Sequence, residues 1–100
     1  EVDAIWGVED LVALGCLQAC EALGRDDVIM VGIDGEQDIL KHIYEGAKQV
    51  KGTAIGDNAG GMASCVESIE RFANGEEVAR FQEIPYVVVT QENIADYYTP

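Results

Sequence analysis

The feature that most constrains this chain is an apolar run at residues 28–33 that ends abruptly at an aspartate and a glycine. The length and β-branched content of the run are typical of a strand buried on both faces, and Asp34 stands directly after it. A shorter apolar run at residues 4–7 is followed within two residues by Glu9 and Asp10. Each expected strand therefore delivers carboxylates at its carboxyl end.

The segment between the two runs has the apolar periodicity of a helix, with Asp10 expected as its cap and Gly24 as its end. A strand, a helix and a second strand in that order imply a parallel pair, because parallel strands need a long crossover connection. Ligands bind beyond the carboxyl ends of the strands in such sheets. We therefore expect Glu9 and Asp34 at an edge where a ligand binds.

The same alternation continues to the end of the chain. We expect helices at residues 36–45 and 59–73, strands at 51–55 and 86–89, and a short acidic segment after Thr90. The order predicts an α/β fold with a three-layer, mostly parallel sheet flanked by helices. So few elements would leave strand edges and helix faces uncovered, which suggests a piece of a longer protein.

Charge and composition narrow the possible partners. Acidic residues outnumber basic ones 19 to 6, and the net charge of −13 argues against binding to nucleic acid or to an anionic membrane surface. Cys16, Cys20 and Cys65 lack the spacing of a zinc site or a disulfide framework. We expect these cysteines to be small core residues, and we expect no metal and no cofactor.

Four stretches, taken in order, resemble one known family. They are residues 3–6 (Asp-Ala-Ile-Trp), 9–15 (Glu-Asp-Leu-Val-Ala-Leu-Gly), 31–35 (Val-Gly-Ile-Asp-Gly) and 84–94 (Ile-Pro-Tyr-Val-Val-Val-Thr-Gln-Glu-Asn-Ile). Together they resemble the carboxyl-terminal part of type I periplasmic sugar-binding proteins, the ribose- and galactose-binding-like receptors of ABC transporters. The resemblance implies a solute receptor, not an enzyme, that delivers a sugar or polyol to a membrane permease. It also implies a periplasmic protein or an extracellular lipoprotein, with an amino-terminal lobe outside this chain.

The resemblance assigns ligand-binding roles to both acidic strand ends. Asp34 matches the family's carboxylate, whose lone pairs accept hydrogen bonds from neighbouring sugar hydroxyls. From the residues alone, Asp34 and Gly35 would equally well form a tight turn or cap the next helix. Glu9 falls where ribose-type members carry an asparagine, which implies a different hydroxyl pattern or a ligand with an amine. An acidic residue is also favoured at a helix start for its own sake.

Two further positions are candidate ligand contacts. Gly56 stands at the family's binding glutamine, so a contact there would come from the backbone, from Asp57 or from Asn58. Trp6 would stack on the apolar face of a sugar ring. Because Trp6 lies inside its strand, a tryptophan in the core or between lobes is the other interpretation.

The family has two α/β lobes that close on the ligand like a hinge. Carried onto this chain, residues 1–55 and 86–100 belong to the second lobe, and residues 57–83 to the first lobe or the crossing. The segment alone would then hold half a binding site and bind sugar only weakly. Without its first lobe it would close into a single unit or form a homodimer.

Two other functions compete with the receptor. The effector domain of a LacI-type transcription regulator shares the fold and the strand-end aspartate, but residues 52–55 and 89–94 resemble the receptors more closely. An enzyme of flavodoxin-like or response-regulator type would need a phosphate-binding glycine loop or a nucleophile paired with a base, and the chain shows neither.

Overall fold

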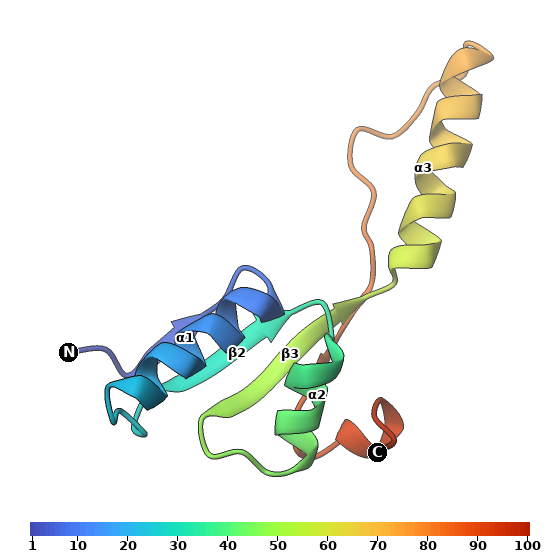
Figure 1. The fold of residues 1–100 in the computed structure, drawn as a ribbon. Coiled ribbons are helices and arrows are strands. Elements are labelled where there is room, and N and C mark those ends of the chain that lie inside the picture. Colours follow the sequence, from blue (N-terminus) through green and yellow to red (C-terminus); the bar gives the residue numbers. More distant parts are fainter. The chain divides into compact units, whose positions relative to one another are not determined.

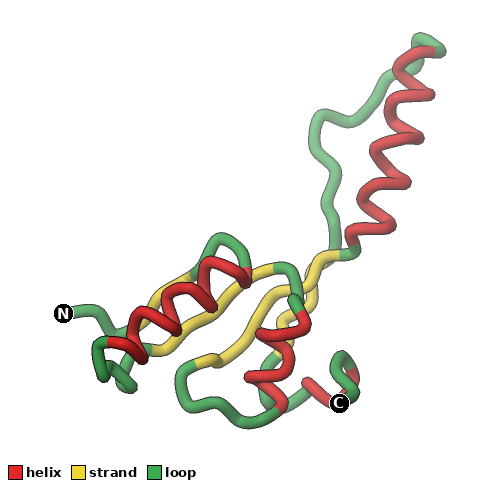
Figure 2. Tube along the Cα trace, viewed as in Figure 1, coloured by secondary structure: helices red, strands yellow, loops and turns green.

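The computed structural model describes residues 1–100, which form two compact units: Glu1–Ile55 with Val87–Pro100, and Gly56–Tyr86. The predicted alternation of strands and helices is confirmed (Figures 1 and 2). The elements are β1 (Ala4–Trp6), α1 (Asp10–Ala22), β2 (Ile29–Ile33), α2 (Gln37–Tyr44), β3 (Val50–Gly56), α3 (Asn58–Ala73), β4 (Tyr86–Val89) and a 3₁₀ helix, η1 (Ile94–Asp96).

The four strands form one sheet in the order β1-β2-β3-β4. β1 pairs in parallel with β2, and β2 in parallel with β3, with a register shift between Met30 and Val31. β4 runs antiparallel to its neighbour β3, since Gly52 lies against Val89, whereas Gly56, further along β3, lies against the earlier residue Tyr86. The sheet is therefore mixed, with three parallel strands and an antiparallel edge, as the expectation of a mostly parallel sheet requires.

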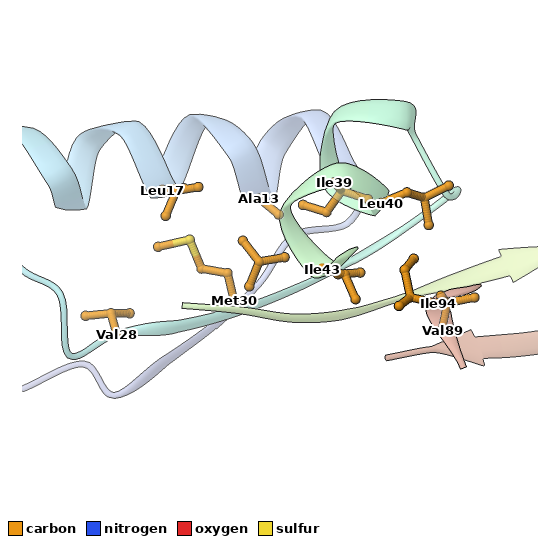
Figure 3. Packing of buried hydrophobic residues seen from close by; sticks show 10 residues of the cluster. Ala13, Leu17, Val28, Met30, Ile39, Leu40, Ile43, Val89 and Ile94 are labelled. Atoms are coloured by element: carbon orange, nitrogen blue, oxygen red, sulfur yellow. The ribbon is translucent and has the colours of Figure 1, made fainter. Parts of the chain in front are cut away.

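Both helices of the first unit lie on the same face of the sheet. Each parallel crossover moves one strand further in the same direction, and right-handed crossovers of this kind put their helices on one side. Figure 3 shows side chains from α1 and α2 meeting the inner face of the strands. The buried core is made of Ala13, Leu17, Val28, Met30, Ile39, Leu40, Ile43, Val50, Val89 and Ile94.

The opposite face of the sheet is open within residues 1–100. Along β2, Met30 and Gly32 are buried while Ile29 and Val31 are exposed. Trp6 at the end of β1 is 65% exposed. The expectation that the strand is buried on both faces is therefore wrong for this chain, whose first unit consists of the sheet and one helical layer.

The second unit contains α3 and the chain that returns from it. Asp57 caps the helix, with its carboxylate accepting from the Gly60 amide at 2.9 Å, and its own amide donates to the Pro85 carbonyl at 3.1 Å. One face of α3 is apolar and exposed, and it consists of Met62, Val66, Ile69 and Phe72. Cys65 is exposed too, so its expected place in a core is wrong, whereas Cys16 and Cys20 pack against the core of the first unit. No helix of the chain combines the length and the apolar character needed to cross a membrane.

Val88 and Val89 offer a matched test of the one-sided core, since they are neighbours of the same type on opposite faces. Val88 is 64% exposed and Val89 is 0% exposed. In residues 1–100 expressed alone, Val89→Ala is expected to lower the free energy of unfolding by about 2 kcal/mol, because it removes buried methyl groups and leaves a cavity. Val88→Ala should change it by less than about 0.5 kcal/mol. Urea unfolding followed by circular dichroism measures both, and equal losses would contradict an open face.

Candidate functional site

The candidate site lies at the carboxyl ends of β1, β2 and β3. Backbone hydrogen bonds hold the two loops that leave this edge: the Gly7 amide donates to the Val31 carbonyl at 2.9 Å, and the Asp34 amide donates to the Ala54 carbonyl at 2.9 Å. Three neighbouring strands that end together bring the loop after β1, the loop after β2 and the end of β3 to one edge.

Asp10 occupies the centre of this edge and is completely buried. The Thr53 hydroxyl donates to its Oδ1 at 2.8 Å, and the amides of Gly35 and Glu36 donate to its Oδ2 at 2.7 and 2.8 Å. The expected role of Asp10 as the cap of its own helix is wrong. Glu9 occupies the cap position of α1 without a side-chain hydrogen bond, whereas the Asp10 carboxylate satisfies the amides that precede α2.

A glycine in β2 makes room for this carboxylate. A Cβ at Gly32 would overlap Asp10 Oδ1, so β2 can pass beneath the first turn of α1 only without a side chain there. A glycine inside an otherwise apolar strand often marks such a close approach. That glycine was the sequence signal that could have located the buried contact of Asp10.

Burial raises the pKa of the Asp10 carboxyl, although the amides of Glu36 and Gly35 and the Thr53 hydroxyl act in the opposite direction. A folded-state pKa above the unfolded value means that the charged form weakens folding relative to the neutral one. The part of the folding stability that is linked to protonation of Asp10 is therefore fully present below the ordinary aspartate pKa and is lost as the pH rises through the raised value, while the hydrogen bonds that the carboxylate accepts remain.

Asp34 differs from Asp10 in every respect that matters for binding. It is exposed, and its φ of 116° makes it the one non-glycine residue of the chain with a positive φ. Such a conformation costs about 1–3 kcal/mol and persists only where the surroundings enforce it. No hydrogen bond or ion pair of the structure uses its carboxylate, which does not cap α2, because Glu36 holds that cap position. Asp34 therefore presents a strained, unpaired acceptor to solvent.

The other predicted contacts lie at different places. Glu9 is exposed in the loop after β1, and its carboxylate takes part in no hydrogen bond of the structure. Trp6 is not in the core, and belongs to the open side of the sheet. Asp57 lies in the second unit, where its carboxylate caps α3. Within the first unit the structure thus brings Glu9 and Asp34 to the same edge.

This edge carries negative charge without a compensating cation in its loops. The loops after β1 and β2 contain the exposed acids Glu9, Asp34 and Glu36 and no lysine or arginine. Arg25 and Lys48 lie in the connections at the other end of the strands, where they pair with Asp27 and Asp26. The edge is suited to accept hydrogen bonds from hydroxyls or to bind a cation.

Two proteins similar in sequence are named as binding proteins. No protein-family model matches this chain. The putative rhizopine-binding protein of Rhizobium meliloti is 32% identical over 99 residues, which are 97% of this chain and 31% of that protein. The ribose import binding protein RbsB of Escherichia coli K12 is 33% identical over 78 residues, 78% of this chain and 26% of that protein.

A solved structure agrees with the fold. An ABC transporter solute-binding protein from Bacillus halodurans C-125, solved with bound myo-inositol, is 39% identical with a TM-score of 0.71 and matches 97% of this chain and 33% of its own. The chain therefore spans about a third of the length of the relatives it matches.

The raised pKa of Asp10 predicts an unusual pH dependence. Asp10→Asn removes the titrating group, so the loss of stability it causes should be larger near pH 3 than near pH 7, since wild-type Asp10 contributes most in acid. Asp27→Asn is the opposite control: the Arg25 guanidinium lowers the Asp27 pKa to about 2, so that contribution is present above the ordinary value and is lost on acidification. Urea unfolding at several pH values measures the loss of stability in both variants. A loss that grows on acidification in both variants, or shrinks in both, would contradict the prediction.

Proposed function

We propose that this chain, a relative of the type I sugar-binding proteins of ABC transporters, is part of a solute-binding receptor that captures a sugar or polyol. The observation that carries the proposal is Asp34, an exposed carboxylate without a partner, held at positive φ at the carboxyl edge of a parallel sheet. The receptor works in the periplasm and hands its ligand to a membrane permease. Its relatives are binding proteins, which supports binding without catalysis.

The chemistry of Asp34 suits a polyol. A carboxylate accepts from two neighbouring hydroxyls at once, and hydrogen bonds to an ionised acceptor are stronger than neutral ones. Because no group of this chain satisfies that carboxylate, a ligand gains those bonds without breaking an internal one. The similar solute-binding protein from Bacillus halodurans was solved with a polyol, myo-inositol, which supports this ligand class.

The two units are proposed to belong to different lobes of the receptor. Residues 1–55 and 86–100 would form part of the second lobe, and residues 57–83 would belong to the first lobe or the crossing. The division of the chain into Glu1–Ile55 with Val87–Pro100 and Gly56–Tyr86 supports this assignment. The exposed apolar face of α3 also supports it, because such a face needs a partner to cover it. On this proposal Asp57 and Trp6 remain candidate ligand contacts, and the homodimer remains a prediction for the isolated chain.

The LacI-type regulator is not proposed. The proteins similar in sequence are named for rhizopine and ribose binding, and the similar solved structure is an ABC transporter component. Nothing in the chain favours a transcription regulator over a transport receptor.

Asp34→Ala tests the proposed ligand contact. In the full-length gene product, calorimetry with ribose, myo-inositol and other sugars and polyols should find a ligand for the wild type. Loss of charge-assisted hydrogen bonds should weaken that binding by about 10- to 100-fold in Asp34→Ala. Asp38→Ala is the matched control, since it removes an exposed acid from the first turn of α2 and should leave the affinity within about twofold. Unchanged binding in Asp34→Ala would remove Asp34 from the site.

Glu9 supports a refinement of the ligand class. A second carboxylate on the same edge, without a nearby lysine or arginine in its loops, favours a ligand that carries an ammonium group. We therefore expect the wild-type receptor to prefer an amino sugar or aminocyclitol over the matching neutral polyol.

Glu9→Gln keeps the shape of the side chain and removes its charge. It should reduce the preference for the amine by about tenfold and leave the affinity for the neutral polyol almost unchanged. Competition calorimetry at low and high salt measures both effects, and the wild-type preference should weaken as salt screens the charge. If Glu9→Gln keeps the full preference for the amine over the neutral polyol, the ammonium group of the ligand does not bind at Glu9.

A further inference from the structure

We infer that Asp10 is a positioning residue whose buried carboxylate sets the direction in which Asp34 meets the ligand. The inference rests on the proposed function, since it explains how the proposed ligand contact is held. Asp10 itself is completely buried and cannot touch a ligand. Its effect on binding must therefore pass through the residues to which it is bonded.

Hydrogen bonds hold the two peptide groups on either side of Asp34. The peptide before it is held by the Asp34 amide, which donates to the Ala54 carbonyl at 2.9 Å. The peptide after it is held by the Gly35 amide, which donates to Asp10 Oδ2 at 2.7 Å. Because peptide groups are planar, fixing both of them fixes φ and ψ of the residue between. The direction of the Asp34 side chain follows from those two angles.

The Asp10 bond is the main one that opposes the strain, because the Gly35 amide donates to Asp10 Oδ2 at 2.7 Å and, at 3.4 Å, to the Thr53 hydroxyl. Left free, Asp34 would be expected to return to a negative φ, since a non-glycine residue keeps a positive φ only where its surroundings enforce it. The Glu36 amide donates to the same oxygen of Asp10 at 2.8 Å, which holds the turn at a second point. The turn cannot relax while the carboxylate keeps its place.

The carboxylate is itself held from the other side. Thr53 donates its hydroxyl to Asp10 Oδ1 at 2.8 Å, and the missing side chain of Gly32 leaves the space that this oxygen fills. The turn also lies directly against β3, because a Cβ at Gly35 would stand 2.6 Å from the Ile55 side chain. Asp10 thus fixes the turn that carries Asp34 relative to β2 and β3.

A double-mutant cycle tests the inference in the full-length gene product. Asp10→Ala should weaken binding of the polyol found for the wild type at least about tenfold, at a temperature well below the melting point of the variant. In the Asp34→Ala background, the same change should alter the affinity by less than about threefold, because the group that Asp10 positions is gone. Asp10→Asn keeps one acceptor oxygen for the turn and should weaken binding less than Asp10→Ala, so it serves if the alanine variant fails to fold.

Ile43→Ala controls for stability alone. Ile43 is buried in the last turn of α2, away from the carboxyl edge of the sheet, so its loss should lower the melting temperature and leave the affinity within about twofold. A weakening in Ile43→Ala as large as that in Asp10→Ala would reduce Asp10 to a structural residue and overturn the inference.

Other outcomes separate the inference from the proposed function. Wild-type affinity in Asp10→Ala with binding lost in Asp34→Ala, or equal effects of Asp10→Ala in both backgrounds, overturns the inference and leaves the function standing. If the wild type binds no sugar or polyol, the proposed function fails. A crystal structure of the Asp10 variant then decides the inference: Asp34 at negative φ supports it, and Asp34 near 116° overturns it.

Discussion

The buried carboxylate of Asp10 is the interaction on which the carboxyl edge of the sheet depends. A charged group inside a protein is tolerated only when hydrogen bonds replace its lost water, and here Thr53, Gly35 and Glu36 provide them. The requirement explains features that look unrelated along the chain. Gly32 must lack a side chain, β3 must carry the hydroxyl of Thr53, and the backbone amides of the turn after β2 must point toward Asp10.

The three acids at this edge of the sheet have different roles, since Asp10 organises the turn and Asp34 and Glu9 are available to a ligand. The donors of the chain satisfy Asp10 at the start of α1 and leave the carboxylates of Glu9 and Asp34 free in the loops after β1 and β2. A binding site needs acceptors that its own chain does not use, held so firmly that they do not reorganise when the ligand arrives. The distinction between a buried and an exposed acid is therefore the physical basis of the proposed receptor, in which neighbouring hydroxyls complete what the fold leaves unsatisfied.

Local patterns predicted the secondary structure well, because each element is bounded by residues whose conformational preference is local. Gly24, Gly46 and Gly75 all have positive φ where a helix was expected to end, as a glycine after a helix commonly does. Long-range packing was predicted less well. The strand at 28–33 reads as buried on both faces from its apolar content, yet only one face is covered, and Cys65 lies on an exposed helix face. Apolar content shows what a segment could bury and does not say whether a partner is present.

The sequence by itself determined the α/β alternation, the parallel pairing and the placement of Glu9 and Asp34 at strand ends, since these follow from periodicity, crossover length and strand direction. Only the tertiary structure decided which acid is buried and which is free. The sequence predicted Asp10 as the cap of its own helix, whereas its hydrogen-bond partners Gly35 and Thr53 lie far along the chain. The strained φ of Asp34 is equally hidden from sequence, because it is imposed by bonds to β3 and to Asp10. Hydrogen bonds that join distant elements produce no periodic pattern in the sequence. Their one signal here was Gly32, which leaves room for the Asp10 carboxylate.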